Sequence, residues 1–346
     1  MKDLLILNDY VPNFIDEVML YFAAKDGENI EVCRHRTLKT LSEYLLDKFS
    51  FDITPYYKEL IAICESLCKF TPLVQFHQDE YFGFRNCYYW NEKIKDGKTY
   101  PQLSFDERMS FFKSWENAVF GSRHIYNSYR EFIIPIIHTS GTNEGIGTGF
   151  LVGQNYVVTA RHCIEGSTSI SFGKLNFDIY RNAKVYYHIN PNIDIAIIHI
   201  DSYEKFGLKL SLECKIFDKV ITMGYPKIPG FTCFQTAEEA VISAIPEKRF
   251  TATEGHIAAE AKQIWSKENL FLVTAKVKGG NSGGPVLNNF GYCIGIVSEI
   301  PFSSGDYDDL GYGTVIPAKF IYEMIQDFSQ HQQSQDIRFV EYPYDE

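Results

Sequence analysis

The spacing of apolar residues changes character near residue 125. Before that point apolar side chains recur every three or four positions, which is the period of a helix with one face turned to a core. Such stretches are Phe14–Phe22, Leu38–Phe49, Leu60–Leu67 and Phe105–Val119. The sequence therefore predicts a mostly α-helical domain over residues 1–125.

Helix-start signals support these assignments. Thr37 precedes one stretch as a cap, and Thr54 precedes Pro55, a residue suited to the first helical position. Ser104 and Glu107 have the spacing of a capping box. The helices should therefore begin at these residues.

After residue 125 the apolar residues gather in short runs separated by Gly, Pro, Asn and Asp. Examples are Phe132–Ile137, Gly149–Val152, Tyr156–Thr159, Ile195–Ile198, Phe271–Thr274 and Ile294–Val297. About a dozen such runs predict antiparallel barrels or a sandwich over residues 126–328, closed by a helix at Phe320–Phe328. The polar, acidic tail, residues 329–346, is expected to be loose.

Composition and charge exclude several classes of protein. Hydrophobic residues make up 45% and charged residues 22% of the 346 residues, which is globular rather than disordered. The formal charge of −11 argues against nucleic acid as the main partner. The apolar runs also fall short of the roughly 18 to 20 residues of a membrane span.

The cysteines and the start of the chain bear on location. Leu4–Leu7 is too short an apolar run, between Asp3 and Asp9, for a signal peptide, so we expect a cytoplasmic protein with reduced thiols. Cys64 and Cys68 lie four apart in a helical pattern, which favours a buried helix face over a metal site. No metal or cofactor is expected.

Three segments carry candidate chemistry. Ser282 lies in the glycine-rich run Gly279–Pro285, where the backbone can turn sharply and present amide groups to one point. His162 follows an apolar strand and supplies a base, while Asp194 opens another strand and can fix the imidazole tautomer. Asp178 and Asp201 are the alternative acids.

The order His162, Asp194, Ser282 in a β-rich domain resembles the trypsin-like serine peptidases, and among them most the HtrA/Deg-type protease domain. The resembling segments are Gly147–Cys163, Asp194–Asp201, Val220–Pro226, Ala240–Ile245, Gly280–Pro285 and Gly311–Pro317. The likeness covers residues 126–328, whereas residues 1–125 resemble no family that would name their role.

The resemblance implies a chymotrypsin-like fold of two six-stranded β-barrels with the active site in the crevice between them. It makes Ser282 the nucleophile, His162 the general base and Asp194 the residue that orients His162. The N–H groups of Gly280 and Ser282 would form the oxyanion hole.

Two departures from that pattern are informative. Asn281 stands where digestive members have an Asp that pairs with a newly cut N-terminus, so activation by clipping is not expected. Cys163 lacks the disulfide partner that secreted members place on the preceding strand.

The nearby run Gly145–Gly149 looks like a nucleotide loop, but no helix follows it, so a hairpin turn is expected.

Substrate preference is implied only by the resemblance. The pocket for the residue before the cut would be lined by Lys276, Val277, Ser298, Glu299 and Ile300. An inward ammonium of Lys276 would favour an acidic side chain. If Lys276 instead points to solvent, the pocket is apolar.

The sequence therefore predicts an intracellular serine endopeptidase that cleaves a protein substrate and is regulated by the helical domain or by a protein partner. One alternative is a catalytically silent scaffold that binds peptides in the crevice. Another makes the helical domain the main function, with the protease domain held inactive.

Overall fold

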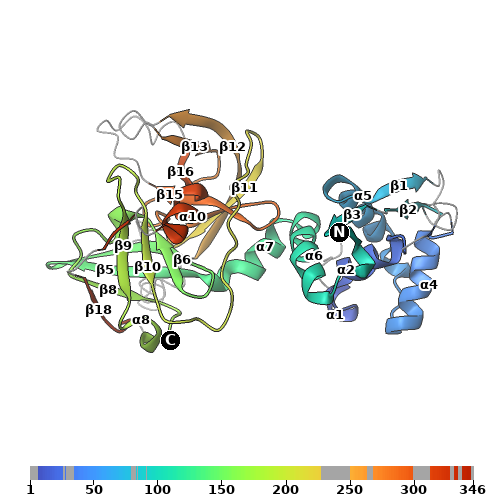
Figure 1. Ribbon diagram of the computed structural model, residues 1–346, viewed down its shortest axis with the longest axis horizontal. Helices are drawn as coiled ribbons and strands as arrows, with labels where there is room; N and C mark the ends of the chain where they lie inside the picture. The colour runs from blue at the N-terminus through green and yellow to red at the C-terminus, as the bar shows by residue number, and fades with distance from the viewer. Residues whose placement is uncertain are drawn as a thin grey trace, which may run out of the picture. The chain divides into compact units, whose positions relative to one another are not determined.

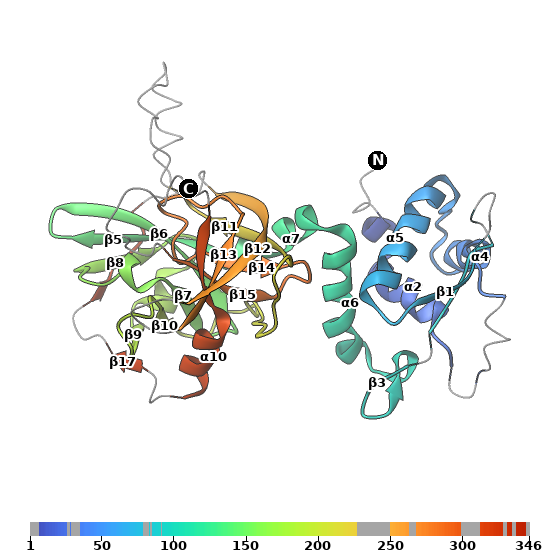
Figure 2. The same cartoon turned by 90° about the horizontal axis from the view of Figure 1, so that it is seen from above.

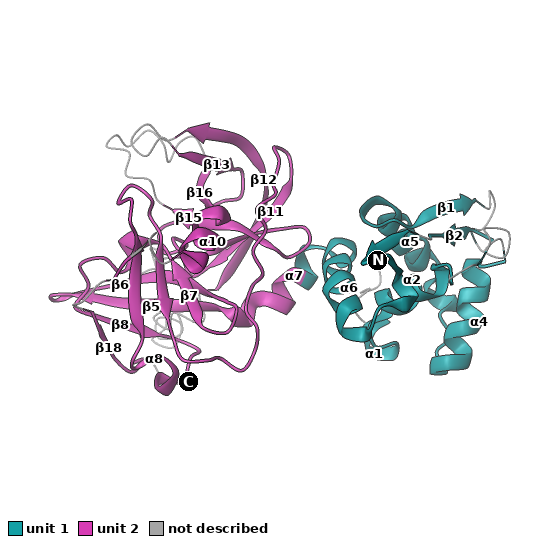
Figure 3. Ribbon diagram, viewed as in Figure 1, with its two compact units in different colours: residues 1–124 teal, residues 125–346 magenta. Residues whose placement is uncertain are grey.

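The computed structural model describes residues 7–25, 28, 35–78, 83, 85–90, 92–226, 250–262, 268–298, 312–327, 331–333 and 337–343. Its contacts divide the chain into two compact units, residues 1–124 and residues 125–346, coloured separately in Figure 3. Each unit has its own hydrophobic core and is described by itself.

The first unit is mostly helical, as the apolar spacing predicts. Its helices are α1 (Leu7–Tyr10), α2 (Phe14–Phe22), α4 (Leu38–Phe49), α5 (Tyr57–Phe70) and α6 (Phe105–Phe120), with short 3-10 turns at Thr54–Tyr56 and Tyr100–Gln102. Its described residues also form two small antiparallel sheets: β1 (Val74–His77) with β2 (Cys87–Tyr89), and β3 (Lys93–Lys95) with β4 (Lys98–Thr99).

Two of the three predicted helix caps are confirmed. Thr37 caps α4, and the Ser104 and Glu107 capping box opens α6. The cap prediction at Thr54 is wrong: its own N–H donates to Asp52 Oδ1 at 2.9 Å, and α5 begins only after a 3-10 turn. An acidic side chain two residues upstream satisfies the free amide there instead.

The core of the first unit also accounts for its cysteine pair and its aromatic residues. Cys64 is fully buried on α5 and Cys68 packs against the same core, as a buried helix face requires. Trp90 contacts both Tyr100 and Trp115, with ring centroids 5.0 and 5.9 Å apart. These side chains are therefore packed in the interior.

The second unit begins within helix α7 (Ser122–Tyr129), and the part of it that the structure describes forms two β-sheets (Figure 1, Figure 2). The first has the order β17-β9-β10-β7-β6-β5-β8-β18, and the second is a closed barrel of order β11-β12-β13-β16-β15-β14. Strands of the first sheet are β5 (Ile133–Ser140), β6 (Asn143–Val152), β7 (Tyr156–Thr159), β8 (Ser169–Phe172), β9 (Lys184–His188), β10 (Ala196–His199), β17 (His331–Gln333) and β18 (Arg338–Phe339). Those of the barrel are β11 (Lys219–Gly224), β12 (Thr251–Lys262), β13 (Asn269–Val273), β14 (Pro285–Asn288), β15 (Cys293–Ser298) and β16 (Gly313–Pro317).

Short helical segments join the strands. Residues 130–132 and 161–163 form 3-10 turns, α8 spans Phe177–Tyr180, and α10 spans Ala318–Gln326. The closing helix predicted from Phe320 is confirmed, starting two residues earlier. Among the described residues, no helix combines the length and apolar character needed to cross a membrane.

The tail departs from the prediction that it is loose. In its described part, β17 pairs with β9 and β18 pairs in parallel with β8, which makes the first sheet eight-stranded. Phe339 is only 8% exposed and packs on Phe172, and the hydroxyl of Tyr180 donates to the carbonyl of Val340. A few apolar residues in a polar tail are enough to fix it to the core.

The hairpin turn predicted at Gly145–Gly149 lies at different residues. The turn is at residues 141–142, and Gly145–Gly149 belongs to β6. A Cβ on Gly147 would lie 2.9 Å from Cys163 Sγ, and one on Gly149 would lie 2.8 Å from Ile136 Cδ1. These glycines allow close packing across the sheet rather than a turn.

Candidate active site

His162 and Asp194 are joined by two hydrogen bonds. His162 follows β7 in a 3-10 turn, and Asp194 lies just before β10, the antiparallel neighbour of β7. Asp194 Oδ2 lies 2.6 Å from His162 Nδ1, and Asp194 Oδ1 accepts the backbone N–H of His162 at 2.8 Å. The carboxylate therefore fixes both the ring and the backbone of His162.

These contacts shift the protonation of the imidazole. Burial alone would lower the pKa of His162, but hydrogen bonds and charge from Asp194 and Cys163 outweigh it and raise that pKa above the ordinary 6.5. The His162 side chain is 40% exposed, so solvent weakens these interactions. The alternative acids lie elsewhere: Asp178 pairs with Arg181, and the amide of Asp201 bonds to Ile179.

Ser298 is the second side-chain partner of Asp194. It ends β15, is 4% exposed, and its hydroxyl donates to Asp194 Oδ2 at 2.5 Å. The sequence assigns Ser298 only to the substrate pocket and misses this contact. A single hydroxyl at the end of an otherwise apolar strand was the available signal.

Ser282 lies in a tight loop that leads into β14. Gly280 and Gly283, on either side of it, have φ angles of 93° and 82°, a conformation that favours glycine. A Cβ on Gly283 would lie 2.2 Å from the carbonyl oxygen of Thr148. Ser282 is 3% exposed, and its Oγ has no hydrogen-bond partner among the described residues.

Thr148, to which the sequence assigns no role, anchors this loop. Its amide donates to the carbonyl of Ser282 at 3.0 Å, and its hydroxyl donates to the carbonyl of Gly280 at 2.7 Å. In the described part of the chain, the backbone N–H groups of Gly280 and Ser282 donate no hydrogen bond to the backbone. Both amides are therefore available to a ligand.

Cys163 lies between the histidine and the serine. Its Sγ is 3.7 Å from His162 Nε2 and 3.4 Å from the carbonyl oxygen of Ser282. The structure thus brings His162, Asp194 and Ser282 to one place, with the histidine and the serine both in contact with the same thiol. Cys163 is itself a free thiol and 4% exposed.

The remaining pocket residues are only partly described. Lys276 is exposed, and Val277 is half-buried against the barrel core, where a Cβ on Gly313 would lie 2.6 Å from its Cγ2. Glu299 and Ile300 lie outside the described residues. Among the described side chains, no group of three His, Cys, Asp or Glu could hold a metal ion.

A histidine is bonded to an aspartate, and a serine lies in a glycine-rich loop that contacts the same thiol as the histidine, on a unit of two mainly antiparallel sheets. This arrangement is typical of the trypsin-like class of site. Residues 147–296 match the family model described as a trypsin-like peptidase domain. The predicted fold class, a helical region followed by a chymotrypsin-like unit, is confirmed, although only the second of its two sheets closes as a six-stranded barrel within the described residues.

Curated relatives share this part of the chain. The "Protease Do-like 2, chloroplastic" of Arabidopsis thaliana is 26% identical over 189 residues, which is 54% of this chain and 28% of the relative. The "Probable periplasmic serine endoprotease DegP-like" of Chlamydia pneumoniae is 32% identical over 193 residues, 52% of this chain and 34% of the relative. DegQ of Escherichia coli, named a periplasmic pH-dependent serine endoprotease, is 27% identical over 195 residues, 54% of this chain and 38% of the relative.

A solved protease structure from M. tuberculosis, in its active form, is 20% identical with a TM-score of 0.45, covering 61% of this chain and 85% of that one. The chain spans between about a quarter and two fifths of the length of these three curated relatives. Residues 147–296 are thus similar to trypsin-like peptidase domains, and the relatives that share this part of the chain include proteins named DegP-like and DegQ.

Proposed function

We propose that this protein is a serine endopeptidase that cleaves a protein substrate through Ser282, His162 and Asp194. The observation that carries the proposal is the pair of hydrogen bonds that Asp194 accepts from His162, together with a Ser282 hydroxyl that has no hydrogen-bond partner among the described residues. Relatives of this domain are named serine endoproteases, which supports the same reaction type.

In the proposed reaction, His162 Nε2 takes the proton of Ser282 Oγ as that oxygen attacks the substrate carbonyl carbon. Asp194 accepts from Nδ1–H and stabilises the imidazolium. The N–H groups of Gly280 and Ser282 would stabilise the oxyanion. His162 then gives its proton to the leaving amine, and water, activated by the same nitrogen, hydrolyses the acyl-enzyme.

This scheme requires one local rearrangement. Within the described ranges the Ser282 hydroxyl has no hydrogen-bond partner, while His162 Nε2 contacts Cys163. Proton transfer therefore needs Ser282 Oγ to come within about 3 Å of Nε2. Such hydrogen bonds often tighten only when substrate binds. If no such closure occurs, the silent peptide-binding scaffold is the better description.

A fluorophosphonate probe tests the proposal. The wild-type protein should be labelled at Ser282, and Ser282→Ala should not be labelled. Proteome-wide mapping of cleavage sites, comparing the two proteins in a lysate, would then identify substrates. If the wild type is not labelled even after residues 1–124 are removed, the endopeptidase proposal is wrong.

We also propose that residues 1–125 regulate or recruit rather than cut. The peptidase match begins at residue 147, and the helical unit has its own core. Labelling rates of the full chain and of residues 125–346 should therefore differ. Equal rates, with equal cleavage of the same protein substrates, would contradict a regulatory or recruiting role.

The proposed location is cytoplasmic, with protein substrates and no nucleic-acid or membrane partner. The cysteines within the described residues are free thiols, which suits a reducing compartment. Two of the relatives are named periplasmic and one chloroplastic, so cell fractionation is the deciding measurement. Recovery in a periplasmic or organellar fraction would overturn this proposal.

A further inference from the structure

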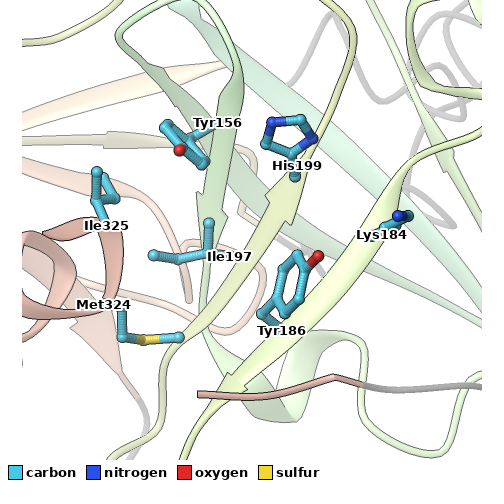
Figure 4. A pocket seen from close by; sticks show the side chains of 7 residues that line it. All are labelled: Tyr156, Lys184, Tyr186, Ile197, His199, Met324 and Ile325. Atoms are coloured by element: carbon cyan, nitrogen blue, oxygen red, sulfur yellow. The ribbon is translucent and has the colours of Figure 1, made fainter. Parts of the chain in front are cut away.

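A pocket of about 260 Å³ lies in the second unit, lined by three strands of the eight-stranded sheet and by α10 (Figure 4). The strands contribute Tyr156 from β7, Lys184 and Tyr186 from β9, and Ile197 and His199 from β10. Met324 and Ile325 come from α10.

Strand alternation explains why these side chains converge. Lys184 and Tyr186 are two residues apart on β9 and so point to the same face, as do Ile197 and His199 on β10. The register pairs His199 with both Lys184 and Tyr156. The pocket is thus part of one continuous face, and Met324 and Ile325 of α10 border it on one side (Figure 4).

The pocket has a cationic and hydrogen-bonding side. Lys184 is exposed and has no ion-pair partner among the described residues, and His199 lies edge-on to Tyr156 at 5.4 Å. The phenol of Tyr186 also lines the pocket, and no described carboxylate does. The ammonium of Lys184 therefore gives this pocket a local positive charge that would attract an anion, although the net charge of the chain is −11.

The opposite side of the pocket is apolar. Ile197 and Met324 are each 3% exposed, and Ile325 is half-buried beside them. Methionine adapts to irregular shapes and makes favourable contacts with aromatic rings. A ligand here therefore needs an apolar, preferably flat, body as well as an anionic group.

We propose that this pocket binds a small carboxylate with an aromatic body, its anionic group at Lys184 and His199 and its ring against Ile197 and Met324. The volume suits a small molecule rather than a folded partner. The pocket lies at the ends of β7 and β10 remote from His162 and Asp194, and the proposal does not depend on proteolysis.

Calorimetric titration of the full chain with indole-3-acetate at low salt tests this proposal, with neutral indole-3-acetamide as the matched ligand. The carboxylate should bind saturably, and the amide about tenfold more weakly. Lys184→Met should weaken carboxylate binding by about tenfold and Lys184→Glu by more. Lys209→Met, which removes another exposed lysine, should leave binding unchanged.

Because Lys184 is exposed, these variants should keep the wild-type melting temperature, which verifies folding. Equal binding of carboxylate and amide would overturn the proposal. So would equal weakening by Lys184→Met and Lys209→Met, or no saturable heat up to about 10 mM carboxylate.

Discussion

Cys163 Sγ lies 3.7 Å from His162 Nε2, the nitrogen that must receive the Ser282 proton in the proposed reaction. The same sulfur also lies 3.4 Å from the carbonyl oxygen of Ser282. The thiol therefore competes with the Ser282 hydroxyl for the base, and it does so from the residue adjacent to the histidine.

Removing this competition should increase the proposed reactivity of Ser282. Because a weak sulfur contact is worth roughly 0.5 to 1 kcal/mol, Cys163→Ala should raise the rate of fluorophosphonate labelling by about two- to fivefold. Cys293→Ala, which removes another fully buried thiol, is the matched control and should leave the rate unchanged. A Cys163→Ala rate at or below that control would show that the contact does not restrain His162.

The same variant should move the pH profile. Cys163 raises the pKa of His162, and the base acts only when deprotonated, so labelling increases as pH rises through that pKa. Without the thiol, the pKa falls and the rising limb should shift to lower pH. A profile measured between about pH 5 and pH 10 that is identical to the wild type would contradict this assignment.

Asp194→Asn should nearly abolish labelling. The substitution preserves shape but removes the charge and favours the wrong imidazole tautomer, which in serine proteases costs about 10⁴-fold in turnover. Asp178→Asn, an exposed alternative acid, should label normally. Comparable losses of labelling in Asp194→Asn and Asp178→Asn would contradict the assignment of Asp194, rather than Asp178, as the acid that acts on His162.

Ser298→Ala should slow labelling through Asp194 rather than through the substrate pocket. Losing one hydrogen bond to a partly buried carboxylate costs about 1.5 to 3 kcal/mol, or roughly a 10- to 150-fold lower rate if the cost falls on the transition state. Ser298→Thr should restore much of that rate if its hydroxyl keeps the contact. A pure pocket role would instead change peptide KM and leave labelling by a small fluorophosphonate unaltered.

Gly283→Ala should destabilise the second unit. The new Cβ would meet the Thr148 carbonyl at 2.2 Å, in addition to the strain of a φ of +82°, so we expect about 3 kcal/mol or more in a urea titration. Gly153→Ala also has a positive φ, but its Cβ would meet nothing within 4 Å. That variant should lower the free energy of unfolding by about 1 kcal/mol. Equal losses of stability in the two variants would show that the contact of the new Cβ with the Thr148 carbonyl is not the cause.

Local patterns in the sequence were sufficient for much of the fold. The helical spacing of Phe14–Phe22 and the capping box at Ser104 are local signals, and the structure follows both. The order of His162, Asp194 and Ser282 indicated a site because three weak motifs agreed. The hydrogen bonds between His162 and Asp194 are consistent with that hypothesis.

What the sequence missed depends on contacts between distant residues. Ser298 meets Asp194 from 104 positions away, and Thr148 meets Gly280 from 132 positions away. The tail strands were missed because a strand of two or three residues has too few positions to show alternation. Near Thr54, the sequence correctly predicts that a side chain accepts a hydrogen bond from a free amide, but the accepting side chain is Asp52 and not Thr54.

The C-terminal segment occupies both margins of the eight-stranded sheet, β17 beside β9 and β18 beside β8. Free backbone amides and carbonyls at a sheet margin are templates for pairing with another molecule. Removing the residues after α10 would expose the unpaired backbone groups of both β9 and β8 at the two edges of the sheet. By pairing with these edge strands, β17 and β18 protect the sheet against self-association. Loss of β17 and β18 would first appear as a fall in solubility.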